Sequence, residues 1–431
     1  MYHLLSGLTL YSELGQDSIL WRVADVLRRA GQPGADRAAL AGEARAQVRR
    51  LLELATACGF DRNLWQDYLA WLLATNENPF SLVCERAAAP TGSVIALARQ
   101  DFAMFHALFQ YNFRPAEEAL GIDAFSILGD YHAVAKSERI VNRCVSANVR
   151  ALSDALAAAP SVQRFMDTVM DFYRRVGVGA LGLNRAFRLH SEGSALALQP
   201  IQNLDAVRLS DLVGYDLQKQ ELIANTEAFL QGQRANNVLL YGDSGTGKST
   251  SVKALPGEYY DRGLRIIELY KHQFEHLSAL LARIKGRNYR FILYLDDLSF
   301  EEFEIEYKHL KAVIEGGLET RPDNVLIYAT SNRRHLIRET WSDRNDMEHG
   351  DDVHRSDTME EKLSLFHRFG VAIHYGKPSR TDYLHIVAEL AVRAGVELPE
   401  QELVQQAGQW EMRHGGLSGR TAQQFINSIR R

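Results

Sequence analysis

The sequence contains few cysteines, no long hydrophobic run and no strong excess of either charge. Its three cysteines, Cys58, Cys84 and Cys144, are far apart in a chain of 431 residues and form no CxxC pair. This number and spacing argue against a disulfide framework or a zinc site and favour a reducing cytosol. No uninterrupted apolar stretch is long enough to cross a bilayer. The first residues have no basic leader before their short apolar run, so they do not resemble a secretory signal.

The charge balance is close to neutral. The sequence has 49 Lys and Arg against 54 Asp and Glu, a net charge of -5. Such a balance gives no global attraction to nucleic acid or to an acidic membrane, although it is compatible with a local basic patch. With 46% hydrophobic and 24% charged residues, the composition predicts a soluble cytoplasmic protein with no membrane partner. The chain is too long for one ordinary core, so we expect two or three domains.

The chain up to about residue 190 has the pattern of a mostly α-helical domain. Apolar residues recur at helical spacing in DSILWRVADVLRRA (17–30) and in SVQRFMDTVMDFYRRV (161–176). Ser161 is the expected N-cap of the second helix. Closely spaced glycines and a Ser-Glu-Gly-Ser cluster follow, so we predict a connector over residues 191–208. The helical domain, residues 1–190, carries no recognisable motif, and we expect it to bind a partner.

From residue 209 the pattern changes to short apolar runs that alternate with helices. These runs are rich in β-branched and aromatic residues and lack strict alternation with polar residues, as in strands buried on both faces of a parallel sheet. We therefore predict an α/β domain with a five-stranded parallel sheet over residues 209–376, followed by a helical segment over 377–431. The predicted strands are NNVLLY (236–241), LRIIELY (264–270), RFILYL (290–295), NVLIYAT (324–330) and GVAIHY (370–375).

The stretch GDSGTGKS, directly after NNVLLY, matches the phosphate-binding pattern G-x-x-x-x-G-K-[ST]. Glycines permit the tight turn and let backbone N–H groups point at phosphate oxygens, and the following helix adds the positive end of its dipole. Lys248 would hold the outer phosphates, and Ser249 would offer its hydroxyl to Mg²⁺. The alternative is a glycine-rich turn without a ligand. The predicted loop residues are Gly242, Asp243, Ser244, Gly245, Thr246, Gly247, Lys248, Ser249 and Thr250.

Polar residues follow two more of the predicted strands. FILYLDD ends in Asp296 and Asp297; the first would hold Mg²⁺ and the second would position the attacking water. NVLIYATSN ends in Asn332, which would lie between these acids and the terminal phosphate. Taken alone, the acids and the amide would also suit turns. Because the run 264–270 lies between the phosphate loop and the acids, we expect an extra strand between their strands, unlike the simple kinase arrangement.

Together these motifs resemble those of AAA+ ATPases. Arg368, in EEKLSLFHRFGVAIHY, resembles the arginine finger that reaches the nucleotide of a neighbouring subunit. Arg420, in GGLSGRTAQQF, resembles the sensor-two arginine of the helical lid, and Gly214 and Tyr215 resemble residues that line the adenine pocket. The resemblance implies Mg²⁺-dependent binding and hydrolysis of ATP. An arginine finger also implies a homo-oligomer, either a ring or a head-to-tail assembly.

The chain is identified as a member of an uncharacterised bacterial AAA+ family, the domain-of-unknown-function eight-fifteen group. Two positions depart from the common AAA+ pattern. Asp297 stands where Glu is usual, which shortens the reach by one methylene and leaves the hydrolysis rate open. His367 stands where an acid usually precedes the finger, which leaves the finger's orientation open. The resemblance covers about residues 205–431 and rests on GYDLQKQELIANTEAFLQG, LYGDSGTGKSTSVKAL, LYLDDLSFEE, ATSNRRHLI and EEKLSLFHRFG.

The resemblance implies a motor that remodels a protein client, whose identity the sequence does not indicate. The Asp-Asp pair also occurs in helicase loaders, so a nucleic-acid-associated loader or transposition-type helper stays open, as does a slow nucleotide-gated switch. A small-molecule kinase fits the strand order and the two arginine segments least. The predicted strand at 264–270 is not followed by an aromatic-Gly pore loop, which argues against a threading unfoldase.

One further cluster invites a metal-site interpretation. His349, Asp351, Asp352 and His354 carry side chains that bind metals, but no fixed ligand spacing supports such a site. We therefore interpret this acidic segment as a solvated loop that becomes ordered at a subunit interface.

Overall fold

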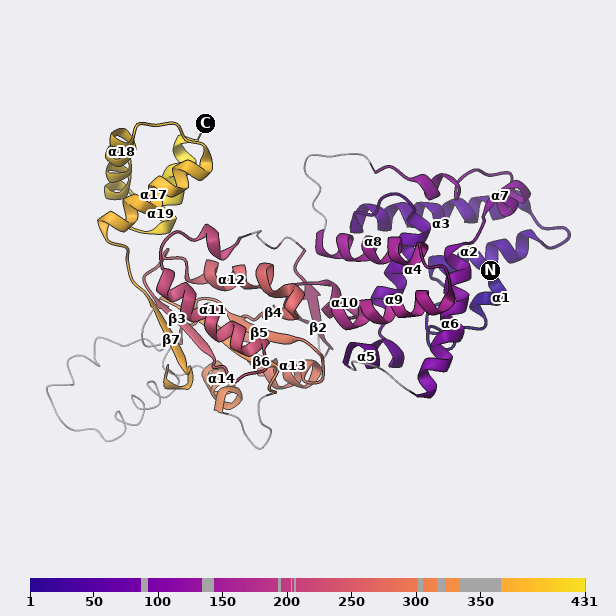
Figure 1. The fold of residues 1–431 in the computed structure, drawn as a ribbon, viewed down its shortest axis with the longest axis horizontal. Helices are drawn as coiled ribbons and strands as arrows, with labels where there is room; N and C mark the ends of the chain where they lie inside the picture. Colours follow the sequence, from indigo (N-terminus) through magenta and orange to yellow (C-terminus); the bar gives the residue numbers. More distant parts are fainter. Residues whose placement is uncertain are drawn as a thin grey trace. The chain divides into compact units, whose positions relative to one another are not determined.

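The computed structural model describes residues 1–86, 92–133, 143–192, 195–202, 204, 207–300, 305–315, 322–332 and 366–430 (Figure 1). The chain divides into two compact units. The first comprises Met1–Asn184 and Pro200–Asn203, and the second comprises Arg185–Gln199 and Leu204–Arg431. Within the described ranges, no helix is both long enough and apolar enough to span a membrane.

The first unit is helical, as the sequence predicted. Helix α9 begins where the Ser161 side chain accepts a hydrogen bond from the backbone N–H of Arg164, at 3.3 Å, which confirms the predicted cap. Helix α2 begins in the same way at Ser18. The helices of this unit are α1 (Tyr2–Leu5), α2 (Ile19–Ala30), α3 (Arg37–Cys58), α4 (Leu64–Thr75), α5 (Pro79–Arg86), α6 (Ser93–Phe109), α7 (Arg114–Leu120), the 3-10 turn η1 (Ile127–Asp130), α8 (Arg143–Ala157), α9 (Val162–Arg175) and α10 (Gly179–Leu183).

Buried polar groups join distant parts of this helical unit. The Tyr173 hydroxyl donates to the carbonyl oxygen of Leu73 at 2.7 Å and lies 2.8 Å from the Tyr11 hydroxyl. The carboxylate of Asp101, in α6, accepts hydrogen bonds from the backbone N–H groups of residues 9–11. Because buried polar groups are costly unless they are hydrogen-bonded, these contacts fix the chain's first residues to α6 and α9. The unit therefore has a hydrophobic core and a polar network of its own.

The second unit is built on a seven-stranded sheet with the order β2-β1-β4-β5-β6-β3-β7. The pairs from β1 to β7 are parallel. Helices α11 to α14 flank the sheet (Figure 1). The elements before the lid are β1 (Ala186–Glu192), β2 (Ala195–Pro200), η2 (Leu209–Asp211), α11 (Asp216–Leu230), β3 (Val238–Gly242), α12 (Lys248–Tyr259), η3 (Tyr260–Arg262), β4 (Leu264–Glu268), η4 (Lys271–His276), α13 (Leu277–Ile284), β5 (Arg290–Leu295), α14 (Ile305–Glu315), β6 (Val325–Ser331) and β7 (Val371–Tyr375).

All five predicted strands form the parallel sheet, but the predicted number of strands was wrong. Strands β1 and β2 occupy residues that we assigned to the end of the helical domain and to the connector. β1 is a true sheet strand, because Phe187 pairs with Ile267 of β4 and its side chain is buried. The flanking glycines and serines concealed it, since such residues usually mark a turn.

The extra strand between the phosphate loop and the acids is also not the one that we expected. In space, β6 lies between β3 and β5, whereas the strand at 264–270, β4, lies on the far side of β5. Strand order in a sheet need not follow chain order, so the sequence alone gave the wrong neighbour.

The helical segment after β7 forms a small lid within the second unit. It contains α17 (Arg380–Ala394), α18 (Glu400–Arg413) and α19 (Gly419–Ile429). These helices share a core that includes Tyr383, Ile386 and Phe425. Helix α17 begins with a reciprocal cap between Ser379 and Asp382. Parallel strands flanked by helices and followed by a helical lid are the α/β architecture that the sequence predicted, with β1 as an additional parallel strand.

Candidate functional site

Three glycines shape the turn between β3 and α12. Gly242, Gly245 and Gly247 have φ angles of 128°, 78° and 96°. Residues other than glycine rarely adopt this region of backbone conformation. A Cβ atom on Gly242 would overlap the carbonyl oxygen of Tyr375, and one on Gly247 would overlap the side chain of Leu212. The local sequence therefore permits a loop that other residues could not form.

Gly242→Ala is expected to destabilise the second unit by about 1–3 kcal/mol, since it adds both backbone strain and an overlap with backbone atoms. A control is Gly257→Ala, in the interior of α12, where an added Cβ lies 3.8 Å from the nearest neighbouring oxygen. This control should stabilise the unit by about 0.5–1 kcal/mol. Hydrogen exchange of β3 and α12 measures both changes. Equal exchange rates in the two variants would contradict the predicted role of Gly242.

The Lys248 side chain curls over the loop that precedes it. Its ammonium donates to the carbonyl oxygens of Gly242, at 2.9 Å, and Asp243, at 2.6 Å. Burial lowers the pKa of Lys248, and the charges of Asp243 and Asp297 oppose that effect. The result is a buried cation at the N-terminal end of α12, which is where an anionic group would bind.

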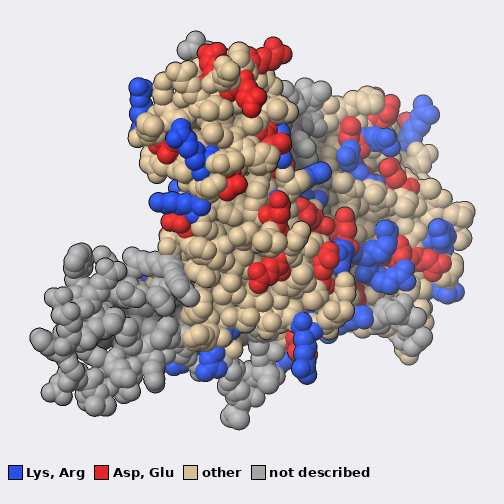
Figure 2. Space-filling model, turned by 60° about the vertical axis from the view of Figure 1, so that its left-hand side comes forward, with Lys and Arg blue, Asp and Glu red and all other residues tan. Residues whose placement is uncertain are grey.

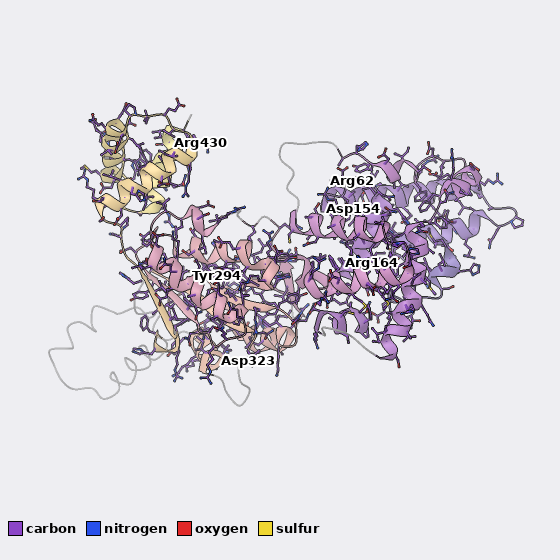
Figure 3. All side chains as sticks on the ribbon, viewed as in Figure 1. Arg62, Asp154, Arg164, Tyr294, Asp323 and Arg430 are labelled. Carbon is purple, nitrogen blue, oxygen red and sulfur yellow. The ribbon has the colours of Figure 1, made fainter. Side chains whose placement is uncertain are left out.

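The Asp296 carboxylate, directly after β5, accepts hydrogen bonds from two hydroxyl groups. Its Oδ1 accepts hydrogen bonds from Ser249 and Thr330, both at 2.7 Å, and its Oδ2 lies 3.3 Å from the Lys253 ammonium. Burial opposes ionisation of Asp296, but the hydrogen bonds from Thr330 and Ser249 outweigh it, so the pKa of Asp296 lies below its usual value. Burial, and then the charge of Asp296, raise the pKa of the neighbouring Tyr294 (Figure 3).

These donors fit a magnesium ion. Mg²⁺ prefers hard oxygen ligands and is usually held by one or two protein side chains together with phosphate oxygens and water. An ionised Asp296 next to the Ser249 hydroxyl, at the first turn of α12, provides such a pair. In the described part of the chain, no group of three or more His, Cys, Asp or Glu residues could hold a metal. The His349 to His354 cluster lies outside the described residues.

The second acid is held by the neighbouring strand. Asp297 has a left-handed backbone, with φ of 52°. Its backbone N–H donates to the Thr330 hydroxyl at 2.9 Å, and its Oδ1 accepts from the Asn332 amide at 2.8 Å. Thr330 thus supports both acids. The sequence analysis missed this residue, although its position two residues before Asn332, at the end of β6, was a usable signal.

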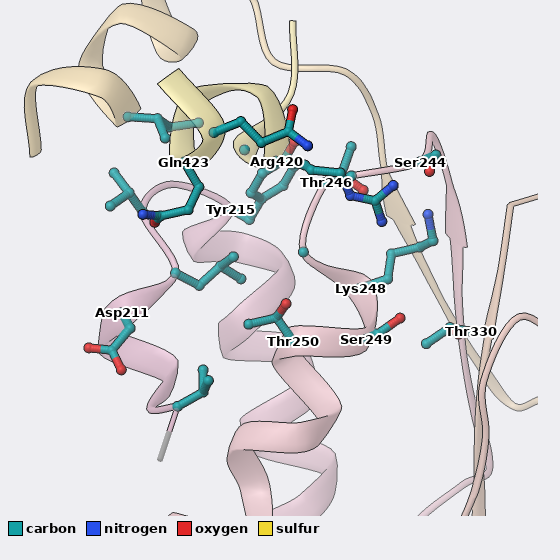
Figure 4. Close-up of a pocket in the computed structure, with 18 of the residues that line it drawn as sticks. Asp211, Tyr215, Ser244, Thr246, Lys248, Ser249, Thr250, Thr330, Arg420 and Gln423 are labelled. Carbon is teal, nitrogen blue, oxygen red and sulfur yellow. The ribbon is translucent and has the colours of Figure 1, made fainter. Parts of the chain in front are cut away.

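These groups surround one cavity of about 610 Å³ (Figure 4). Its described lining residues do not include Gly214, Gly242 or Asp243, which we predicted for the site, nor Arg368, which we predicted to reach the site of a neighbouring subunit. Arg368 lies exposed in the helical turn before β7. The predicted residues that do line the cavity are Tyr215, Ser244, Gly245, Thr246, Gly247, Lys248, Ser249, Thr250, Asp296, Asp297, Asn332 and Arg420.

The lid forms one wall of the cavity. Figure 4 shows Arg420, at the start of α19, reaching from the lid toward the end of Lys248. The Arg420 backbone N–H donates to the carbonyl oxygen of Gly245 at 3.2 Å, so lid and loop are in direct contact. Ile386 and Leu390 of α17 face the cavity together with Leu212. No sequence pattern marked this apolar wall, because apolar residues at helical spacing in α17 are also what the core of the lid requires.

A second lid contact is made with the chain segment that precedes Tyr215. The Arg393 guanidinium, in α17, donates to the backbone carbonyl oxygens of Asp211, at 2.9 Å, and Ser210, at 3.0 Å. The lining of the cavity thus combines phosphate-binding groups with apolar and aromatic side chains. A nucleotide presents the same two chemistries, charged phosphates and a flat base.

Comparison with known proteins identifies a family for the second unit. A family model described as "Protein of unknown function (DUF815)" matches residues 183–431. No curated protein matches the chain. Among solved structures, RuvB of Thermotoga maritima, described as a Holliday junction branch migration motor, is 15% identical with a TM-score of 0.35. The match covers 51% of this chain and 63% of that one. A mutant of the same protein gives 16% identity, a TM-score of 0.36 and coverages of 51% and 64%. The chain thus spans less than two thirds of these proteins.

Proposed function

We propose that this chain, which belongs to the DUF815 family, is an AAA+ ATPase that binds and hydrolyses ATP with Mg²⁺. One observation carries the proposal. Residues 244–250 of the phosphate loop, the Asp296–Ser249 pair, the Asp297–Asn332 pair and Arg420 all line a single cavity. The cavity volume lies in the range of small-molecule sites.

Each group has a distinct part in the proposed reaction. Lys248 and the backbone N–H groups of the loop bind and orient the phosphates. Ser249 and Asp296 would hold Mg²⁺, which supplies charge neutralisation at the outer phosphates. Asp297 orients the attacking water and accepts its proton, and Asn332 fixes that carboxylate at 2.8 Å.

We assign Arg368 to the nucleotide of a neighbouring subunit. It is exposed and absent from the described lining of its own chain's cavity, which supports action in trans. Its guanidinium would stabilise charge on the transferred phosphoryl group. This assignment requires an assembly in which subunits meet head to tail, as a ring or an open series.

Mixing Arg368→Ala protein with Lys248→Ala protein is therefore expected to restore part of the ATPase activity that each lacks alone. An intact site on one subunit would meet an intact finger from the other. Phosphate release across a series of mixing ratios measures the effect, with an excess of either variant alone as the control. No recovery, in mixtures shown by light scattering to co-assemble, would contradict action in trans.

We further propose that turnover remodels a protein client bound by the helical unit. The separate core of that unit supports a binding role distinct from the ATPase unit. A nucleic-acid-associated role has no comparable support: on the face shown in Figure 2, acidic and basic side chains are interspersed. A slow nucleotide-gated switch is the second candidate, because Asp297 is short for its role and is held by Asn332.

Calorimetry with ATP, in Mg²⁺ and in EDTA, tests the proposed activity, and phosphate release distinguishes a motor from a slow switch. No binding of ATP in either condition would refute the proposal. The client is tested by capture from lysate with Asp297→Asn protein in Mg-ATP, against Lys248→Ala protein, with and without nuclease. A protein partner that requires ATP and survives nuclease supports remodelling. Recovery of nucleic acid, or partners lost with nuclease, supports the loader-like role.

A further inference from the structure

The connection between the sheet and the lid is fastened by three side chains. This connection, residues 374–377, comprises the last two residues of β7 and the two residues that follow them toward α17. Besides the β3–β7 ladder, their backbone groups take part in four hydrogen bonds. Two come from side chains of the segment before β3: the Gln218 amide donates to the carbonyl oxygen of His374 at 3.1 Å, and the Tyr215 hydroxyl donates to that of Gly376 at 2.9 Å. The other two involve Asp243. Its backbone N–H donates to the carbonyl oxygen of Tyr375 at 3.0 Å, and its Oδ2 accepts from the backbone N–H of Lys377 at 3.0 Å.

Asp243 is the member of this set that belongs to the phosphate loop. Its N–H and its carboxylate bind two different residues of the connection, Tyr375 and Lys377. Its carbonyl oxygen accepts the 2.6 Å hydrogen bond from Lys248. One residue thus touches both the phosphate-binding cation and the chain that enters the lid.

Phosphate binding does not explain an acid at this position. The loop pattern accepts any residue there, and a carboxylate beside an anion-binding loop repels the anion. The Asp243 charge is felt at Lys248, where it opposes the effect of burial. The hydrogen bond from the Lys377 N–H gives this acid a structural role that phosphate binding does not.

We infer that Asp243 is a positioning residue that couples the phosphate loop to the lid through the backbone N–H of Lys377. This inference rests on the proposed ATP binding. Phosphates draw the Lys248 ammonium away from the carbonyl oxygens of Gly242 and Asp243. The change at Asp243 passes through Lys377 to α17, while the Arg420 N–H contact with Gly245 holds the other end of the lid.

Two pairs of variants test this coupling from its two sides. Asp243→Ala removes the acceptor, and Asp243→Asn keeps an acceptor oxygen while removing the charge. Lys377→Pro removes the donor, and Lys377→Ala keeps the N–H while removing only the side chain. Proline suits position 377 because the residue before Pro378 already favours extended backbone.

The measurement is hydrogen exchange of α17 and α19 with and without saturating Mg-AMP-PNP, with binding itself followed by calorimetry. In the natural protein, AMP-PNP should slow exchange in both helices. In Asp243→Ala and Lys377→Pro this slowing should fall by about fivefold, the effect of losing one ordinary hydrogen bond. Asp243→Asn and Lys377→Ala should keep it. If Asp243 acted only on the phosphate loop, Asp243→Ala would weaken AMP-PNP binding, but Lys377→Pro would leave the protection of the lid helices unchanged.

The outcomes separate the coupling from the activity on which it rests. If the natural protein does not bind AMP-PNP, the proposed function fails. If binding occurs and the lid is protected equally in Lys377→Pro and Lys377→Ala, the coupling is refuted whatever Asp243→Ala does. If Asp243→Ala and Lys377→Pro lose protection and the double variant loses no more than either alone, the two groups act as one contact.

Discussion

Replacing Lys248 with alanine is expected to weaken ATP binding by at least about 100-fold. Lys248 is the buried cation of the cavity. Each charge-assisted hydrogen bond that it makes to a phosphate contributes about 1.5–3 kcal/mol, and no other lysine among the described lining residues can replace it. Calorimetry with Mg-ATP measures the loss.

Lys308→Ala provides the matched control. This lysine is exposed on α14 and outside the described lining of the cavity, so its removal changes the net charge equally. ATP affinity should stay within a factor of about two, as expected for a distant screened charge. Retained affinity in Lys248→Ala, with a folded second unit by circular dichroism, would exclude the proposed role of the phosphate loop.

Asp297→Asn is expected to keep ATP binding and to lower phosphate release by about 10²–10⁴-fold, the range for loss of a general base. Asparagine keeps the size of the side chain and an oxygen that accepts from Asn332, but it cannot take a proton. Single-turnover phosphate release at saturating ATP measures the effect, and calorimetry confirms that binding remains.

Asp261→Asn serves as the control, because Asp261 is an exposed acid in η3 outside the described lining of the cavity. It should leave turnover unchanged. A normal rate in Asp297→Asn would transfer the base role to another group. Asp297→Glu adds the missing methylene, and a rate above the natural one would show that the short acid limits turnover.

Local patterns predicted the parts of the site that lie within one stretch of chain. The phosphate loop depends on glycine conformations and on a strand followed by a helix, and both leave strong signals in sequence. The strands β3, β4, β5 and β6 were predictable for a similar reason, because burial on both faces requires continuous apolar runs, and the edge strand β7 retains enough of that pattern to be found. The sequence analysis missed β1 because turn-forming residues flank it, and only its pairing with β4 in the structure identifies it as a strand.

The contacts between strands could not be predicted in the same way. Register pairs Leu295 with Ala329, and this places Asp296 beside Thr330, 34 residues further along the chain. The sequence predicted that the two acids and Asn332 would meet, since parallel strands end at one edge of the sheet. It did not predict which strand lies in the middle, and so it missed Thr330 as the shared hydrogen-bond partner of both acids. The lid wall was missed because its residues are ordinary core-type side chains.

The pairing of β1 with β4 has a practical consequence for the boundary of a stable fragment. The fold begins at Arg185, whose carbonyl oxygen accepts a hydrogen bond from the N–H of Ile266. A fragment starting at residue 209, where the α/β pattern begins in sequence, would strip β4 of its neighbour and leave a row of backbone donors and acceptors open to another chain. Self-association through that edge would resemble a natural assembly in a sizing experiment while being an artefact of truncation. A fragment that starts at residue 185 retains β1 and β2 and keeps β4 inside the sheet.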